Sequence, residues 1–264
     1  MSEANQRRAG GRDPLFRGVG VALLTLFGSQ GQVDAAATAE HAERLLAEGV
    51  RAILGVGTTG EAITLSEQER VDVLTALRNV VPAEVPLIAG TGAASAYQAE
   101  RLTAAARDAG ADAVLALSPP RSMDLQGYYE RVAKAADGIP VLAYHFPAAS
   151  SPGIDVDTLV GLPVHGVKDS SGEPARLLAI LPRFDGDVFV GSAALLSYAG
   201  PLGCDGALLA LANLEPRTCA AAFTGDAGAQ LALADSHFAA TRDFPRTLKR
   251  LLADRHGTSP ASRL

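Results

Sequence analysis

Residues 165–172 read His-Gly-Val-Lys-Asp-Ser-Ser-Gly, a short apolar run that delivers a lysine into a polar turn. The pattern predicts a buried strand over residues 164–168 with Lys168 at its end. The chain has three lysines in all, at positions 134, 168 and 249, so this placement stands out. An amine held in an apolar pocket loses solvation of its charged form, so its pKa falls and it attacks carbonyl groups more readily. The alternative is an ion pair with Asp169 at a solvated strand end.

The same strand pattern recurs along the chain, each time followed by a helical pattern, at a spacing of about 25 residues. The eight predicted strands span residues 18–27, 50–56, 85–89, 113–117, 140–144, 164–168, 187–190 and 206–211. Continuous apolar runs of this kind are typical of parallel sheets, whose strands are buried on both faces. The repeat predicts an α/β fold, a (β/α)8 TIM barrel with extra C-terminal helices.

A doubly wound open sheet is the alternative architecture. Its first strand is usually followed by a Gly-x-Gly-x-x-Gly turn, and residues 28–32 read Gly-Ser-Gln-Gly-Gln instead. This difference favours the barrel.

The length of 264 residues suits one α/β domain, and no interdomain linker is visible. We predict a disordered N-terminal tail over 1–17, the barrel over 18–223, a C-terminal helical extension over 224–256 and a frayed C-terminus over 257–264. One helix has a clear start, because Ser66 and Glu69 have the spacing of a capping box.

Composition excludes several classes of partner. The net charge of −6 argues against a general nucleic-acid or anionic-membrane binder.

No apolar run reaches the ~18 residues that a membrane span requires. The first residues are polar and basic, unlike a secretory signal. Cys204 and Cys219 lack metal-binding or redox spacing, so we expect a cytoplasmic protein with reduced thiols.

The barrel rule brings four separate features to one place, because the carboxyl ends of all eight strands meet at one mouth. Lys168 ends the sixth predicted strand and Tyr144 ends the fifth. Residues 57–60 follow the second strand, and Gly191 with Ser192 follows the seventh.

Residues 57–61 read Gly-Thr-Thr-Gly-Glu and form the most specific of these loops. Two glycines allow a tight turn in which backbone N–H groups and two hydroxyls face one small space, a nest suited to a carboxylate. The alternative is a Gly-rich turn whose threonines bond locally. The loop lacks the Gly-Lys-Ser/Thr ending of a P-loop.

Tyr144 is a candidate proton shuttle, although a tyrosine is often a core residue with a satisfied hydroxyl. His145 competes for this role, since its ordinary pKa is nearer neutrality. Neighbouring residues of a strand point to opposite sides, so only one of the two faces the mouth. No His, Cys and carboxylate cluster has metal-ligand spacing, so we expect no metal.

Three motifs together resemble the dihydrodipicolinate synthase / N-acetylneuraminate lyase family: residues 57–61, residues 144–147 (Tyr-His-Phe-Pro) and residues 166–172. Their order and spacing match, and the resemblance extends from about residue 18 to residue 223. It implies a (β/α)8 class I aldolase or lyase acting on pyruvate or a related 2-oxo acid.

Transferred residue by residue, the resemblance implies that Lys168 forms the Schiff base with the 2-oxo carbon and that Tyr144 relays protons. It implies that Thr58 and Thr59, in the loop opened by Gly57, hold the carboxylate. The covalent imine would serve as electron sink, so no separate cofactor is expected.

The sequence departs from true dihydrodipicolinate synthases in two places. These carry a Tyr-Tyr pair after the fourth strand, where residues 118–121 read Ser-Pro-Pro-Arg and the next tyrosine is Tyr128. They also place an arginine shortly after the catalytic tyrosine, where residues 148–152 read Ala-Ala-Ser-Ser-Pro. Both departures argue against lysine biosynthesis. Residues 168–172, Lys-Asp-Ser-Ser-Gly, resemble the sugar-acid and sialic-acid branch of the family more closely.

Further substrate contacts are expected at four residues. Gly191 and Leu208 occupy positions that line the pyruvate pocket in relatives. Ser150 is a candidate for binding hydroxyls of a sugar acid, and Arg121 for binding a distal carboxylate. A loop-stabilising serine and a solvated arginine are the alternatives.

The sequence therefore predicts a cytoplasmic lyase that makes or cleaves a 2-keto-3-deoxy sugar acid, or a similar 2-oxo acid, through a Lys168 imine. Its expected partners are a 2-oxo acid, an aldehyde and copies of itself, as a dimer or tetramer. The alternatives are a 4-hydroxy-tetrahydrodipicolinate synthase, which joins pyruvate to aspartate semialdehyde, with altered auxiliary residues; a hydratase-type relative; and a non-catalytic barrel that binds 2-oxo acids.

Overall fold

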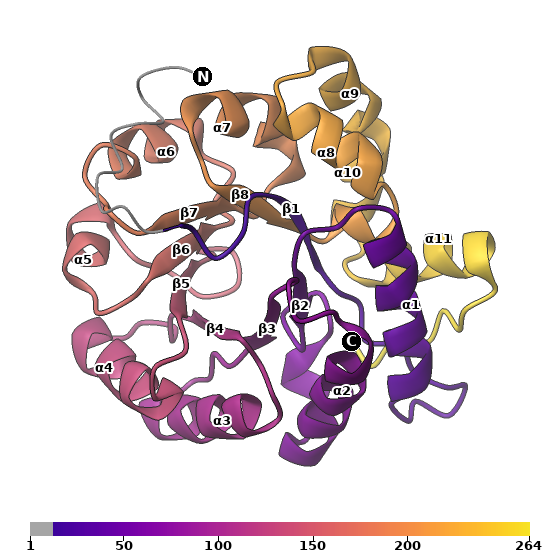
Figure 1. Ribbon diagram of the computed structural model, residues 1–264, viewed down its shortest axis with the longest axis horizontal. Helices are drawn as coiled ribbons and strands as arrows, with labels where there is room; N and C mark the ends of the chain where they lie inside the picture. The colour runs from indigo at the N-terminus through magenta and orange to yellow at the C-terminus, as the bar shows by residue number, and fades with distance from the viewer. Residues whose placement is uncertain (1–12) are drawn as a thin grey trace.

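A computed structural model describes residues 13–264, in which eight parallel strands form a closed barrel (Figure 1). Each strand pairs with the next, and the last pairs with the first. The strands are β1 (Gly18–Ala22), β2 (Ile53–Gly55), β3 (Leu87–Gly90), β4 (Ala113–Leu117), β5 (Val141–His145), β6 (Gly166–Asp169), β7 (Asp187–Val190) and β8 (Gly206–Leu209). The predicted (β/α)8 barrel is confirmed.

Helices surround the barrel and connect successive strands (Figure 1). They are α1 (Ala35–Ala47), α2 (Glu67–Val80), α3 (Ala96–Asp108), α4 (Leu125–Ala136), α5 (Val156–Gly161), α6 (Pro174–Ile180), α7 (Leu196–Leu202) and α8 (Pro216–Phe223). The predicted capping box is present, since the Ser66 hydroxyl accepts from the Glu69 N–H and the Glu69 carboxylate accepts from the Ser66 N–H. Helix α2 therefore begins where the sequence predicts.

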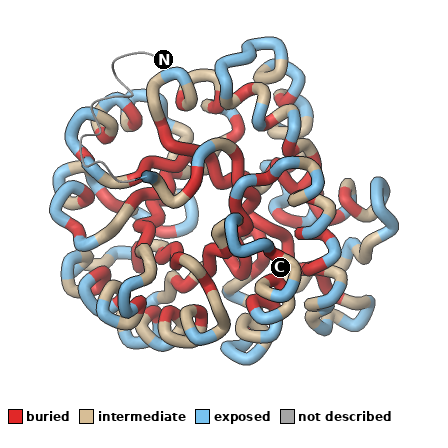
Figure 2. Tube along the Cα trace, in the orientation of Figure 1, coloured by how far each residue is buried: buried red, intermediate tan, exposed pale blue. Residues whose placement is uncertain are grey.

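The apolar core has two parts. One lies between the strands and the surrounding helices, and a smaller one fills the inside of the barrel. Figure 2 shows the strands as a buried centre and the outward sides of the helices as the exposed surface. The inner core includes Leu142, Tyr144, Phe189 and Leu208, so alternate residues of β5 to β8 point inward.

The first strand is shorter than its apolar run. Residues 18–27 were expected to form one strand, and β1 ends at Ala22. Residues 23, 24, 26 and 27 are nevertheless buried, and the Leu24 N–H donates to the Asn213 side chain at 3.1 Å. These residues are apolar because the chain continues past the edge of the barrel and is covered there by segments that follow β8.

The helical extension consists of α9 (Ala227–Ala232), α10 (Ala234–Arg242) and α11 (Arg246–His256). Residues 257–264, expected to fray, contain neither helix nor strand but are fixed by hydrogen bonds to the loop after β2. Figure 1 places the C-terminus beside α2. The polar composition of this segment does not indicate that it contacts a buried carboxylate.

The predicted tail over residues 1–17 falls mainly on residues 1–12, which lie outside the described residues. Residues 13–17 are described, and Phe16 among them is buried. Its ring stacks on Phe189 with centroids 4.5 Å apart. Phe16 precedes β1 and so helps to fill the barrel at the end opposite the mouth.

Candidate active site

Lys168 and Tyr144 are neighbours across two adjacent strands. The register of β5 and β6 pairs them directly, and the Lys168 Nζ lies 4.5 Å from the centroid of the Tyr144 ring. Lys168 is only 4% exposed. Burial lowers the pKa of its amine from the ordinary 10.5 to about 7, because the charged form loses its hydration. A large share of the amine is therefore neutral and nucleophilic at neutral pH.

Asp169 shapes the turn after β6 instead of pairing with the lysine. Its carboxylate accepts from the Arg176 Nε at 2.5 Å, from the Ser171 N–H at 2.9 Å and from the Ser171 hydroxyl. Both Asp169 and Arg176 are largely buried, so the aspartate charge is matched within the protein. The alternative of a solvated Lys168–Asp169 pair therefore does not describe this site.

Tyr144 faces the barrel interior and His145 faces away from it. Burial raises the pKa of the Tyr144 phenol to about 12, and interactions with Ser170 and Thr58 partly oppose that rise. The His145 Nδ1 accepts from the Ile154 N–H at 2.9 Å on the opposite side of β5. Strand alternation thus selects the tyrosine, and its phenol remains protonated near neutral pH.

The loop after β2 brings Thr58 and Thr59 to the same cavity as Lys168. The turn is tight: the Glu61 N–H donates to the Thr58 carbonyl at 3.1 Å and the Ala62 N–H to the Gly57 carbonyl at 3.2 Å. Two hydroxyls close to an amine can hold an anionic group next to a carbonyl that the amine attacks.

Gly191 leaves room for the amine. A Cβ atom at this position would lie 2.9 Å from the Lys168 Cε and 1.8 Å from the Ser170 Oγ. Any larger residue would force the lysine or the serine to move. The glycine after β7 therefore maintains the space in which Lys168 works.

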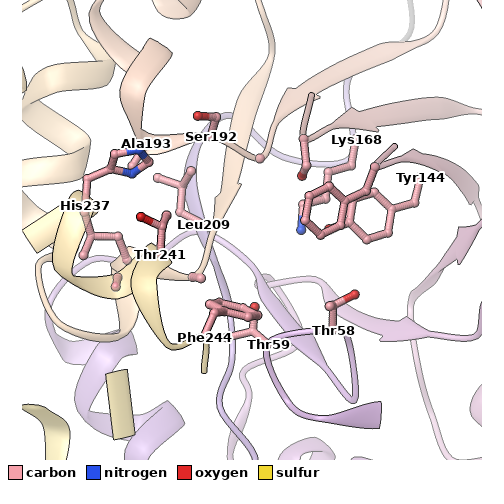
Figure 3. Close-up of a pocket in the computed structure, with 16 residues that line it drawn as sticks. Thr58, Thr59, Tyr144, Lys168, Ser192, Ala193, Leu209, His237, Thr241 and Phe244 are labelled. Carbon is pink, nitrogen blue, oxygen red and sulfur yellow. The ribbon is translucent and has the colours of Figure 1, made fainter. Parts of the chain in front are cut away.

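These residues line one cavity of about 350 Å³ at the carboxyl ends of the strands. In Figure 3, Lys168 and Tyr144 lie on one side, and His237, Thr241 and Phe244 lie opposite them. Of the described residues that line it, Lys168 and His237 are the ones with a basic side chain, and none is acidic. The cavity is lined by Thr58, Thr59, Tyr144, Phe146, Lys168, Ser170, Gly191, Ser192, Ala193, Leu209, Ala210, Leu211, His237, Ala240, Thr241 and Phe244.

Four predicted site residues lie outside this lining. Leu208 is fully buried in the inner core, while Leu209 reaches the cavity. Gly57 opens the threonine turn without lining the cavity itself. The Ser150 hydroxyl is buried and donates to the Ser118 carbonyl, and Arg121 is exposed. Their substrate contacts stay predictions.

Tyr128 and the adjacent Tyr129 do not supply the tyrosine pair that the sequence lacks after β4. The Tyr128 hydroxyl donates to the Leu117 carbonyl at 3.0 Å, and the Tyr129 hydroxyl donates to the Ala116 carbonyl at 2.9 Å. Both phenols are therefore bound to the backbone of β4, away from the cavity.

The sequence did not identify the residues of the helical extension that complete the cavity. His237 and Thr241 are one turn apart on α10, and Phe244 follows that helix. Burial lowers the pKa of His237. Their spacing on α10 places them on one face, but no local motif indicates that this face returns to the barrel mouth.

Within residues 13–264, no three His, Cys, Asp or Glu side chains are grouped so that they could hold a metal ion. The helices of the same residues include none long and apolar enough to cross a membrane.

The sequence matches the model of the Dihydrodipicolinate synthetase family over residues 15–250. The chain belongs to this family. It is also 35% identical over 235 residues to a 4-hydroxy-tetrahydrodipicolinate synthase of Pseudomonas aeruginosa, covering 84% of this chain and 80% of the relative. The enzyme of that name from Natronomonas pharaonis is 35% identical over 226 residues, covering 80% of this chain and 76% of the relative.

Solved structures of the dihydrodipicolinate synthetase family share the fold. The Acinetobacter baumannii dihydrodipicolinate synthase, solved with pyruvate, superposes with a TM-score of 0.87 at 30% identity, covering 94% of this chain and 92% of that one. YagE, a prophage protein from E. coli K12 also solved with pyruvate, gives a TM-score of 0.85 at 25% identity, covering 94% and 91%. The predicted family is confirmed, and the protein is a lyase of the class I, Schiff-base aldolase type.

Proposed function

We propose that Lys168 forms an imine with the C2 carbon of pyruvate or a related 2-oxo acid. The protein then makes or breaks the C3–C4 bond of a 2-keto-3-deoxy acid through the derived enamine. One observation carries this proposal: the buried Lys168 amine, with its pKa lowered to about 7, lies beside the Tyr144 ring in the cavity that Thr58 and Thr59 line. A non-catalytic barrel that only binds 2-oxo acids would not need an activated amine there.

Each residue has a distinct task in the proposed reaction. The neutral Lys168 amine attacks C2, and the carbinolamine loses water to give the imine. The Tyr144 phenol donates and recovers protons at the carbinolamine oxygen and at the aldehyde oxygen. Thr58 and Thr59 hold the carboxylate of the 2-oxo acid. The Tyr144 phenolate left by loss of water takes the C3 proton of the imine, which gives the enamine and restores the phenol. The enamine attacks the aldehyde carbon while the phenol protonates the aldehyde oxygen, and hydrolysis of the new imine releases the product.

The polar groups that line the cavity favour a neutral, hydroxylated aldehyde. Ser192, Thr241 and His237 are polar groups that can hydrogen-bond hydroxyls, and no arginine is among the described lining residues. A carboxylate on the aldehyde would find no guanidinium there to bind it in two places. We therefore place a 2-keto-3-deoxy sugar acid ahead of the product of pyruvate and aspartate semialdehyde.

A 4-hydroxy-tetrahydrodipicolinate synthase is the second candidate function. The names of the curated relatives, at 35% identity, favour it. For that reaction the protein would have to bind the carboxylate of aspartate semialdehyde through groups other than an arginine in the cavity.

The two candidate functions can be distinguished by testing which aldehyde the enzyme accepts. Pyruvate would be supplied with glyceraldehyde or with aspartate semialdehyde, and pyruvate consumption would be followed. Pyruvate release from 2-keto-3-deoxy sugar acids would test the reverse reaction. We expect turnover of the hydroxylated compounds, with His237→Leu lowering kcat/KM for the aldehyde about 10-fold or more. Turnover of aspartate semialdehyde alone would reverse the ranking.

Three further properties complete the proposal. The reaction needs no cofactor, because the lysine imine itself stores the electron pair. The protein works in the cytoplasm as a homo-oligomer, a dimer or tetramer. Light scattering after size-exclusion chromatography tests the assembly, and full activity after dialysis against a chelator tests the absence of a metal requirement.

A further inference from the structure

Glu61, the last residue of the Gly-Thr-Thr-Gly-Glu turn, is completely buried and is bound by the far end of the chain. One carboxylate oxygen accepts from the Ser262 hydroxyl at 2.9 Å, the Arg263 N–H at 2.7 Å and the Leu264 N–H at 3.0 Å. The other oxygen pairs with the Lys249 Nζ, which is also completely buried. A buried carboxylate needs such partners, because an unpaired charge away from water is very costly.

The lysine joins the terminal segment to the helical extension. The Lys249 Nζ, on α11, also donates to the Ala261 carbonyl at 2.9 Å. It lies 4.0 Å from the centroid of the Phe27 ring. Residues 261–264 are therefore held against Glu61 through both their backbone and α11.

Arg263 holds the same segment against the elements that flank the turn. Its guanidinium binds both oxygens of Glu69, at 2.6 and 3.0 Å, in the first turn of α2. It also donates to the Thr64 carbonyl at 3.0 Å and to the Gly31 carbonyl at 2.7 Å. The interaction with Arg263 is the main reason that the pKa of Glu69 is lowered to about 2. Loops after β1 and β2 and the start of α2 are thus joined at one side chain.

The turn that these contacts hold is not relaxed. Val56 before it and Glu61 at its end both have left-handed backbone angles, with φ of 46° and 55°. Such angles are unfavourable for residues other than glycine, most of all for a β-branched valine, and persist where surrounding contacts impose them. Since Thr58 and Thr59 lie between these two residues, their positions depend on what holds Glu61.

We propose that Glu61, Lys249 and residues 261–264 form a positioning element for the carboxylate-binding turn. The proposal rests on the proposed function, in which Thr58 and Thr59 hold the 2-oxo acid. None of these residues lines the cavity, so they act through the backbone of the turn. Loss of the segment leaves the Lys168 amine in place and lets the two threonines move, which weakens binding of the 2-oxo acid.

The test compares the full chain with a chain lacking residues 261–264 and with Arg263→Gln. Rates of pyruvate-dependent borohydride trapping at several pyruvate concentrations give an apparent KM and a maximal rate. We expect the KM for pyruvate to rise about 10-fold or more in the shortened chain, since displacement of a binding group by an ångström has effects of that size. The maximal trapping rate should change less than about threefold, and Arg263→Lys should recover part of the loss in Arg263→Gln.

Arg101→Gln is the matched control. Arg101 also pairs with a glutamate in the first turn of α2, Glu67, at 2.9 Å, but both side chains are more than half exposed. This variant should keep the KM of the full chain. Hydrogen exchange provides a second measurement, in which the Glu61 and Ala62 amides of the shortened chain exchange at least about 10-fold faster.

An unchanged KM and unchanged exchange at these two amides in both variants would overturn the proposal. If maximal rate and affinity fell equally, or if Arg101→Gln changed the KM by the same amount, the segment would only stabilise the folded protein in general. Either result would also overturn the proposal. Failure of the proposed function looks different, because the full chain itself would then form no pyruvate adduct.

Discussion

Replacing Lys168 with methionine should stabilise the folded protein, and the gain should depend on pH. The amine is 4% exposed, and burial alone accounts for its lowered pKa. Methionine has a similar length and no charge, so Lys168→Met removes the cost of burial without opening a large cavity.

The size of the effect follows from the two pKa values of the lysine. The folded-state pKa is about 7 and the ordinary value is 10.5. At about 1.4 kcal/mol per pH unit, the gap corresponds to roughly 5 kcal/mol of destabilisation. Below pH 7 the Lys168 amine is protonated in both the folded and the unfolded state, so the full destabilisation from burying its charge is present. Between pH 7 and 10.5 the unfolded chain keeps a proton that the folded chain has released, so stability rises with pH by about 1.4 kcal/mol per unit.

Lys168→Met should therefore raise the free energy of unfolding by about 5 kcal/mol at pH 6 and by about 2 kcal/mol at pH 9. Urea unfolding of the wild type and the variant at both pH values measures the difference. Lys134→Met, which removes an exposed lysine in the last turn of α4, is the control for loss of one charge. An equal difference at pH 6 and pH 9, or a variant less stable than wild type at pH 6, would refute the reasoning.

Three other substitutions test separate parts of the site. Tyr144→Phe should lower turnover about 100-fold or more, because proton transfer is lost at both the carbinolamine and the aldehyde oxygen. Pyruvate should still become trapped on Lys168, whose burial is unchanged, but more slowly than in wild type; steady-state kinetics and the rate of borohydride trapping check this. Gly191→Ala should abolish trapping in a folded protein, since the new Cβ would lie 2.9 Å from the Lys168 Cε; normal trapping would contradict it. Arg176→Gln should reduce the free energy of unfolding by roughly 3 kcal/mol, measured in urea, because it removes the cationic partner of the buried Asp169 carboxylate.

The sequence could predict the fold and the centre of the site because both depend on local patterns. Apolar runs mark the buried strands, and a strand end marks the barrel mouth, so Lys168 and Thr58 are brought together by the fold alone. Strand alternation predicted that only one of Tyr144 and His145 faces the mouth, and the structure places them on opposite sides of β5 with Tyr144 inside the barrel.

The remaining parts of the site depend on how distant segments pack. Ser150 follows β5 closely in sequence, but its hydroxyl turns to the Ser118 carbonyl and not to the cavity. His237 completes the cavity from α10, and no local pattern specifies where that helix docks. Residues 257–264 are polar and resemble a frayed end, yet the buried Glu61 carboxylate binds them. Such contacts are set by tertiary structure, which a single sequence does not display.

The central claim is that Lys168 is the amine that forms the imine. Wild-type protein would be incubated with pyruvate and borohydride, digested, and its peptides weighed by mass spectrometry. We expect one pyruvate-derived adduct, on the peptide that contains Lys168, and none when pyruvate is omitted or Lys168 is replaced by methionine. An adduct on Lys134 or Lys249, an adduct that persists in Lys168→Met, or no adduct at saturating pyruvate would contradict the account.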